Sequence, residues 1–154
     1  MDQMTIQQKI NTNWVYANFF GTPNDRIIYL KQLIESDDQA VNTYFNLANS
    51  YNSLFQYDKA ITQFEKALGI YKNWGVKPFW VFNYAYLGDS YRATGQLRKE
   101  ANLYKKAERD FPDNPQVVGR QAILSLTLGD TVAANQYLRK FIALGSSWSI
   151  PESC

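Results

Sequence analysis

The sequence repeats itself at spacings of 40 and then 34 residues, and this self-similarity constrains the fold more than any other feature. The segment 44–51 aligns with 84–91, with tyrosine, leucine, a small residue, serine and tyrosine in register. A third segment keeps the frame 34 residues later, with Ala122, Gly129, Ala134, Leu138 and Phe141. A period of this length is typical of a helical hairpin that stacks on copies of itself.

Within each repeat the apolar residues recur at helical spacing, and no alternating pattern of a β-strand interrupts them. We therefore expect an all-α chain of about eight helices. The expected helices span residues 4–20, 24–36, 39–54, 57–73, 78–93, 97–110, 115–128 and 131–144.

The repeated residues resemble the tetratricopeptide repeat (TPR) family. The unit 81–114 fits best, although Glu100 stands where the family has alanine. Its matching residues are Tyr84, Leu87, Gly88, Tyr91, Gly95, Tyr104, Ala107 and Pro112. The resemblance implies an α-solenoid, in which antiparallel helix hairpins stack into a right-handed superhelix, and a non-enzymatic role in protein–protein interaction.

The repeat frame divides the chain into units. We expect a degenerate repeat or capping hairpin at 1–38, a repeat with an extended helix and linker at 39–80, a repeat at 81–114, a weaker repeat at 115–145 and a tail at 146–154. In the first unit, Trp14 stands where a small residue belongs and Ala17 where tyrosine belongs. The alternative is that residues 1–20 are a capping helix outside the frame.

The turn inside each hairpin favours a left-handed residue, which explains Gly95 and Gly129. Projected back along the repeat, the same position falls on Phe55 and then on Gly21. Gly21 precedes Thr22-Pro23, which predicts an N-cap with proline at the first helical position. In the linker between the second and third units, we expect Trp74, Phe79 and Trp80 to close an apolar seam; the alternative is a separate binding role for these three residues.

The composition excludes much enzyme chemistry. The chain has no histidine and one cysteine, Cys154, so a Ser-His-Asp triad, a Cys-His pair, a His-ligated metal and a disulfide framework are all excluded. Neither glycine-rich phosphate loop is present. We predict no catalytic residue, no cofactor and no metal site, and hence a protein that is not an enzyme.

Charge and hydropathy restrict the partners. A net charge of +2 is too small to predict nucleic-acid binding, and no apolar run is long enough to predict membrane insertion. The N-terminus lacks the basic and apolar regions of a secretory signal, so we expect a cytoplasmic protein if Met1 is the native start.

The resemblance places the first helix of each unit along a concave groove, and the groove positions of the unit from 41 are rich in asparagine. Four asparagines on one helix face cost about 2 kcal/mol relative to alanine unless another interaction offsets them. Because an amide both donates and accepts hydrogen bonds, we expect Asn42, Asn46 and Asn49 to hold the backbone of an extended peptide. Phe82 and Tyr86 would form an apolar pocket, with Arg92 and Arg120 as anchors for acidic groups and Asp89 at a further groove position. The alternative is a merely solvated polar face.

Two other surfaces allow different readings. The second helix of the central unit carries Arg98, Lys99, Lys105, Lys106 and Arg109 interleaved with Glu100, Glu108 and Asp110, which predicts a solvated mixed face or, alternatively, a phosphate-binding strip. The C-terminal helix ends in apolar residues, so the alternative function is a structural segment of a longer repeat array or a domain that self-associates through this helix.

The family's clamp for acidic chaperone tails needs two lysines where this chain has Phe45 and Gln116, which disfavours that ligand.

Overall fold

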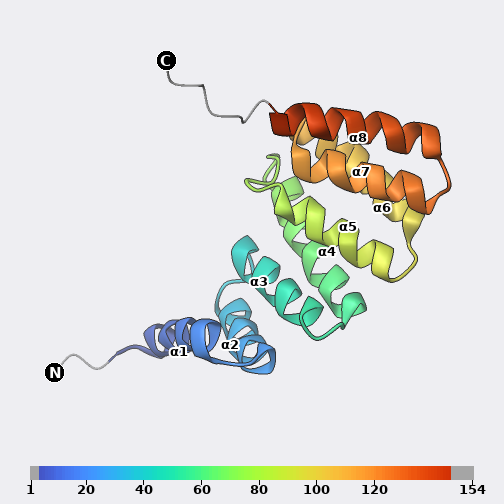
Figure 1. Ribbon diagram of the computed structural model, residues 1–154. Helices are drawn as coiled ribbons and strands as arrows, with labels where there is room; N and C mark the ends of the chain where they lie inside the picture. Colours follow the sequence, from blue (N-terminus) through green and yellow to red (C-terminus); the bar gives the residue numbers. More distant parts are fainter. Residues whose placement is uncertain (1–3, 147–154) are drawn as a thin grey trace, which may run out of the picture. The chain divides into compact units, whose positions relative to one another are not determined.

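The computed structural model describes residues 4–146, and within them the chain forms eight α-helices and no β-strand (Figure 1). The helices are α1 (Ile6–Phe20), α2 (Pro23–Ser36), α3 (Val41–Asn52), α4 (Tyr57–Asn73), α5 (Phe82–Ala93), α6 (Leu97–Asp110), α7 (Pro115–Thr127) and α8 (Thr131–Ser146). The predicted all-α array is confirmed, and each helix ends within four residues of its expected bounds. Of the predicted tail at 146–154, Ser146 is the last residue of α8, and the rest, with Cys154, lies outside the described residues.

The helices form two compact units that meet at Pro78 in the sequence. The first unit contains α1 to α4, and α2 packs against both α1 and α3. The second unit contains α5 to α8, and α7 packs against α5, α6 and α8. Short connections join consecutive helices within each unit into hairpins, as Figure 1 shows.

Local sequence signals explain where the first helices begin. The Thr5 side chain caps α1, and the backbone and side chain of Gln8 complete a capping box. Thr22 caps α2 in the same way with Asp25, while Pro23 occupies the first helical position, as predicted. The Thr22 hydroxyl and backbone N–H both hydrogen-bond to the Asp25 carboxylate, which lowers the pKa of Asp25 below its usual range.

The repeated residues form the core of both units. Tyr44, Leu47, Ala48 and Tyr51 of α3 are buried, as are their counterparts on α5. The pairing of small and bulky residues follows from close helix contact. A Cβ added to Gly88 would lie 2.2 Å from the Tyr104 hydroxyl oxygen, so α5 and α6 pack closely only because this position is glycine.

Backbone geometry confirms three of the four predicted hairpin turns. Gly95 and Gly129 adopt left-handed φ angles of 72° and 76°, and Phe55 adopts the same conformation at 57° without being glycine. The projection onto Gly21 is wrong, because its φ of −91° is extended. Gly21 instead allows a close approach: a Cβ there would lie 2.7 Å from the Ala17 carbonyl oxygen.

The linker between the units also departs from expectation. The helix α4 does continue to Asn73, and Gly75 then takes a left-handed φ of 70°. The prediction of an apolar seam is wrong, because Trp74, Phe79 and Trp80 are all exposed. Two of these exposed rings pack on less exposed ones: Trp74 packs on the buried Tyr71, and Trp80 packs on the half-buried Phe82.

The first hairpin has a thin core. Four apolar residues recur at helical spacing on α2, but only Leu30 is fully buried, while Ile27, Leu33 and Ile34 are half-buried. On α1, Ala17 is buried and Trp14 is half-buried. A bulky indole therefore fills space where the other repeats have a small residue, and it leaves room beside it for the pocket described next.

Candidate functional site

The first unit contains a polar pocket between α1, α2 and α3, here called the Arg26 pocket. Its volume is about 220 Å³. Two of the asparagines predicted to bind a peptide, Asn46 and Asn49, line it, whereas Asn42 is exposed and lies outside it. The lining residues are Trp14, Asn18, Arg26, Leu30, Asn46, Asn49, Ser50 and Ser53.

The polar groups of the Arg26 pocket lack partners within the described part of the chain. The side-chain amides of Asn46 and Asn49 make no hydrogen bond there, and Arg26 makes no ion pair. The indole Nε1 of Trp14 is buried and likewise has no acceptor. No acidic residue lines the pocket, so its charge is positive and its hydrogen-bond donors are in excess.

The serine hydroxyls of the Arg26 pocket are, in contrast, already used by the helix. Ser50 donates to the carbonyl of Asn46 at 2.9 Å, and Ser53 donates to the carbonyl of Asn49 at 3.0 Å. These bonds hold the hydroxyls against the α3 backbone. The side chains of the pocket that are left to hydrogen-bond a bound molecule are therefore the amides and the guanidinium.

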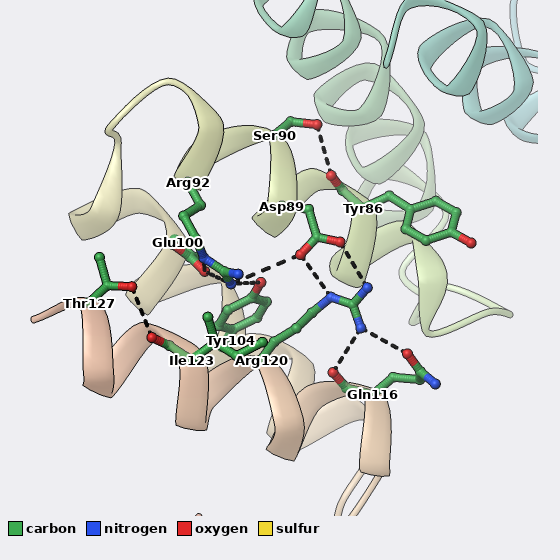
Figure 2. Close-up of polar contacts among 10 residues, drawn as sticks. All are labelled: Tyr86, Asp89, Ser90, Arg92, Glu100, Tyr104, Gln116, Arg120, Ile123 and Thr127. Carbon is green, nitrogen blue, oxygen red and sulfur yellow. Dashed lines mark hydrogen bonds and ion pairs between the residues drawn. The ribbon is translucent and has the colours of Figure 1, made fainter. Parts of the chain in front are cut away.

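In the second unit, the predicted residues Asp89 and Arg120 pair with each other (Figure 2). Arg120 on α7 donates from Nε and Nη2 to the two carboxylate oxygens of Asp89 on α5, at 3.0 and 2.8 Å. Arg120 also donates to the Gln116 side chain and backbone. A bidentate pair of this kind fixes α5 against α7. An acidic ligand at Arg120 would have to compete with Asp89.

Arg92, the other predicted anchor, is paired with Glu100 on α6. Its Nε donates to the Glu100 carboxylate at 2.9 Å, and its Nη2 contacts the same oxygen (Figure 2). Burial alone would disfavour the charge on Arg92, but the hydrogen bond and charge of Glu100 outweigh it and hold the pKa of Arg92 above its ordinary value. Burial, reinforced by the charge of Glu100, raises the pKa of Tyr104 beside this pair.

The interpretation of Glu100 as part of a solvated face is wrong, because its side chain is 0% exposed. The same register position holds a buried alanine in the unit from 41, so the Glu100 carboxylate lies in the core. The ion pair with Arg92 offsets part of the free energy that is needed to bury this charge. The other oxygen, Oε2, is buried without a partner in the described residues. The sequence signal was an acidic residue at a position reserved for a small one.

The five basic residues of the predicted mixed face are exposed, as expected: Arg98, Lys99, Lys105, Lys106 and Arg109. Its other two acidic residues are not simply solvated, because Glu108 and Asp110 are half-buried, Glu108 pairs with Lys140, and Asp110 accepts a hydrogen bond from Tyr84. On α5, Phe82 and Tyr86 lie with their ring centroids 5.2 Å apart, so the structure brings these two predicted residues together. Both are half-buried.

Sequence reasoning missed a second pocket, of about 470 Å³, in the second unit. Apolar residues of α7 and α8 form most of it, including Ile123, Leu126, Leu138 and Phe141, and the Asp89–Arg120 pair lies at one side. The signal that could have found it was the repeat register, because Leu138 and Phe141 occupy positions that are buried in the preceding units.

Within residues 4–146, no group of three or more acidic residues, histidines or cysteines could hold a metal ion. Over the same residues, no helix is both long and apolar enough to cross a bilayer.

Comparison with known proteins agrees with the helical hairpins. Solved structures with the same fold include MamA, with a TM-score of 0.79 and 18% identity over 93% of this chain and 80% of that one. A Podosopora anserina putative kinesin light chain with nearly identical TPR-like repeats has a TM-score of 0.70 and 15% identity, over 93% of this chain and 76% of that one. In the Cut9-Hcn1 structure of the APC/C, the match has a TM-score of 0.70 and 15% identity, over 86% of this chain and 24% of that one.

These matches define the class: an α-solenoid of helix hairpins. The sequence agrees, because residues 39–113, just under half of the chain, match the model of the tetratricopeptide repeat. The segment 39–113 is thus of the tetratricopeptide repeat type, and this repeat is in general a protein–protein interaction fold. No curated protein sequence matches the chain.

Proposed function

We propose that this protein binds an extended segment of a partner protein along the first helices of its repeats, with α3 as the main contact. The observation that carries the proposal is the pair of amides on α3: Asn46 and Asn49 line a pocket and have no side-chain hydrogen bond among the described residues. Amides in this state can pair with the N–H and C=O groups of a peptide backbone, which recur in every sequence.

In this proposal the other predicted residues have supporting roles. Asn42 extends the amide row by one helical turn beyond Asn46. In the second unit, Phe82 and Tyr86 offer an aromatic surface to apolar side chains of the partner. Asp89, Arg92 and Arg120 contact polar atoms of the partner while they keep the ion pairs that hold α5, α6 and α7 together.

The test uses peptides selected on the immobilised protein from a random peptide library. The double variant Asn46→Ala/Asn49→Ala should weaken the selected peptides by at least tenfold, because two amide contacts at about 1 kcal/mol each are lost. The matched control Asn102→Ala/Asn135→Ala removes two exposed amides of the second unit and should leave the affinity unchanged. Fluorescence anisotropy measures the affinities, and circular dichroism checks the fold. Equal affinity for the Asn46/Asn49 variant would refute peptide capture by α3.

A second candidate function, self-association through α8, is favoured by a separate observation. Leu138 and Phe141 are 40% and 42% exposed, whereas the residues in the same register of α6, Tyr104 and Ala107, are 1% and 0% exposed. In α6 these positions are covered by packing within the unit. The corresponding face of α8 is suited to another helix of the same kind, such as one from a second copy of the chain.

A further inference from the structure

Helix α1 exposes a position that the first helix of each later hairpin buries. On α3, α5 and α7 this position holds Ser50, Ser90 and Leu124, which are 3%, 1% and 6% exposed. Spacings of 34, 40 and 34 residues place Tyr16 of α1 in the same register, and its side chain is 66% exposed. Phe20, one turn further along α1, is 77% exposed, and its ring centroid lies 5.1 Å from that of Tyr16. These two aromatic residues are here called the α1 face.

A comparison of α1 with α3 shows what normally covers this position. Helix α1 packs on α2, its hairpin partner, and buries Ala17. Helix α3 buries Tyr51, which is the counterpart of Ala17, and also Ser50. It packs both on its hairpin partner α4 and on α2, the second helix of the preceding hairpin. Since α1 has no preceding hairpin within residues 4–146, its exposed position is the one that packs on a preceding hairpin.

Helix α8 exposes the other half of such a contact. Its exposed residues Leu138 and Phe141 are in register with Tyr104 and Ala107 of α6, which are buried. The hairpin of α5 and α6 is covered by α7, which packs against both helices. On the hairpin of α7 and α8, the apolar pocket of about 470 Å³ lies at these residues instead. This pocket, with Leu138 and Phe141, is here called the α8 face.

The ion pair that joins α5 to α7 has neutral counterparts on the two faces. In the second unit, Arg120 of α7 pairs with Asp89 of α5 (Figure 2). If α1 followed α7 as α7 follows α5, the register would place Thr12 at the Arg120 position and Ile123 at the Asp89 position. At the positions of this pair, such a contact buries neither a carboxylate nor a guanidinium, so no desolvation cost of a charge opposes it there.

We propose that the α1 face of one copy of this protein packs on the α8 face of a second copy, as α3 packs on α2 and α7 packs on α6 within one copy. This inference rests on the second candidate function, self-association through α8, and names the surface that α8 binds. The contact is heterologous, because it joins two different surfaces of the same chain. A contact between two α8 helices would pair two second helices, which is not how neighbouring hairpins pack in either unit.

The size of the α8 face suits the two rings of the α1 face. An apolar cavity of about 150 Å³ holds one benzene ring. The pocket of about 470 Å³ therefore has room for the rings of Tyr16 and Phe20. Its apolar lining, which includes Ile123 and Leu126, matches the chemistry of these rings.

Complementary variants of the full chain test the proposal. Tyr16→Glu/Phe20→Glu places charges on the α1 face and leaves the α8 face intact, whereas Leu138→Glu/Ile142→Glu blocks α8 and leaves the α1 face intact. Each variant alone should sediment as a monomer at concentrations where the wild type associates. An equimolar mixture should form a dimer, because the intact α8 face of one variant meets the intact α1 face of the other.

Fluorescence anisotropy measures the affinity of the mixed pair. The chain has one cysteine, so a maleimide dye on Cys154 labels Leu138→Glu/Ile142→Glu, whose α8 takes no part in the mixed contact. Titration with Tyr16→Glu/Phe20→Glu should saturate at equimolar stoichiometry. Unlabelled Leu138→Glu/Ile142→Glu, which offers no intact α8 face, should not bind.

A matched control separates the α1 face from a general effect of added charge. Phe55→Glu/Val76→Glu places two glutamates at exposed apolar positions of loops in the first unit and should associate as the wild type does. Circular dichroism checks that every variant keeps its helical content.

The outcomes distinguish this inference from both candidate functions. If Tyr16→Glu/Phe20→Glu associates by itself as the wild type does, the α1–α8 contact is refuted and self-association through α8 stands. The contact is also refuted if the wild type associates but the mixture stays monomeric. A wild type that is monomeric at every concentration refutes both the contact and self-association through α8. Peptide capture is tested separately, because Asn46 and Asn49 lie on α3, outside both faces.

Discussion

Phe55 is the residue at which this chain departs most clearly from its own repeat. It has a left-handed φ of 57°, in the turn position that Gly95 and Gly129 occupy in the later hairpins. A side chain in this conformation costs about 1–2 kcal/mol relative to glycine. The ring is 78% exposed and makes an edge-to-face contact with Tyr57. Packing of the ring therefore offsets little of the backbone strain.

We therefore expect Phe55→Gly to stabilise the protein. The gain in free energy of unfolding should be about 0.5–1 kcal/mol, because relief of the left-handed strain exceeds the extra entropy of glycine in the unfolded chain. Urea denaturation measures it. Phe55→Ala keeps the backbone cost and loses only the ring, so it should show no gain. Equal stability of the glycine and alanine variants would contradict the strain argument.

At the residue scale, the repeat frame predicted Phe55 correctly and Gly21 incorrectly. Both positions follow from the same projection, but only the first lies in a regular hairpin. At Gly21 the close approach to the Ala17 carbonyl and the Thr22 cap select an extended backbone instead. Local sequence cannot show this, because the constraint arises from where α1 ends relative to α2.

At the scale of the secondary-structure elements, α5 and α6 are joined by a tyrosine–carboxylate hydrogen bond that requires the tyrosine to stay protonated. The Tyr84 hydroxyl on α5 donates to the Asp110 carboxylate at the end of α6, at 2.5 Å. Burial, together with this hydrogen bond and the negative charge of Asp110, raises the pKa of Tyr84 well above 10. Tyr104 on α6, which is more deeply buried, shifts in the same direction.

This predicts a loss of stability at alkaline pH. Above pH 10 tyrosine ionises in the unfolded chain, whereas buried Tyr84 keeps its proton, so the folded state binds more protons and stability falls as the pH rises. Each such group contributes a slope of up to about 1.4 kcal/mol per pH unit. Below pH 10 both states are protonated and the contribution is constant.

Tyr84→Phe tests this linkage. The variant should lose about 1–2 kcal/mol at pH 8, where the hydrogen bond to Asp110 is intact, and its stability should then fall less steeply than that of the wild type between pH 10 and 11.5. Urea unfolding across this range measures both effects. Asp110→Asn keeps an acceptor but removes its charge, so its slope should be intermediate. A slope equal to that of the wild type in Tyr84→Phe would show that Tyr84 does not carry the linkage.

The helices themselves were predictable because they depend on local pattern. Apolar periodicity, the Thr22-Pro23 cap and the hairpin glycines define α2, α6 and α8 to within two residues. The aromatic residues of the linker were not, because Trp74, Phe79 and Trp80 look like core residues by type. Their burial depends on whether another surface covers them, which periodicity does not encode.

At the scale of the whole molecule, the exposed apolar face of α8 bears on whether the protein is a monomer or a dimer. If α8 mediates self-association, sedimentation should show a concentration-dependent shift from monomer to dimer over the micromolar range. Leu138→Glu/Ile142→Glu, which places charges on the exposed apolar face, should be monomeric throughout. Gln136→Glu, on the opposite side of the helix, should associate as the wild type does. A wild-type chain that remains monomeric at every concentration would contradict this second function.

The sequence by itself determined the repeat, the helices and the burial of the repeated residues such as Tyr44, Leu87 and Tyr91, because each of these follows from contacts within a hairpin or between neighbouring hairpins. The tertiary structure alone decided which polar groups meet. It brought Arg92 to Glu100 inside the core, paired Asp89 with Arg120, and left Arg26, Trp14, Asn46 and Asn49 around one pocket without an acid. The reason is physical: the partner of a charged or polar group is set by the packing of distant segments, and a single sequence records the groups but not their distances.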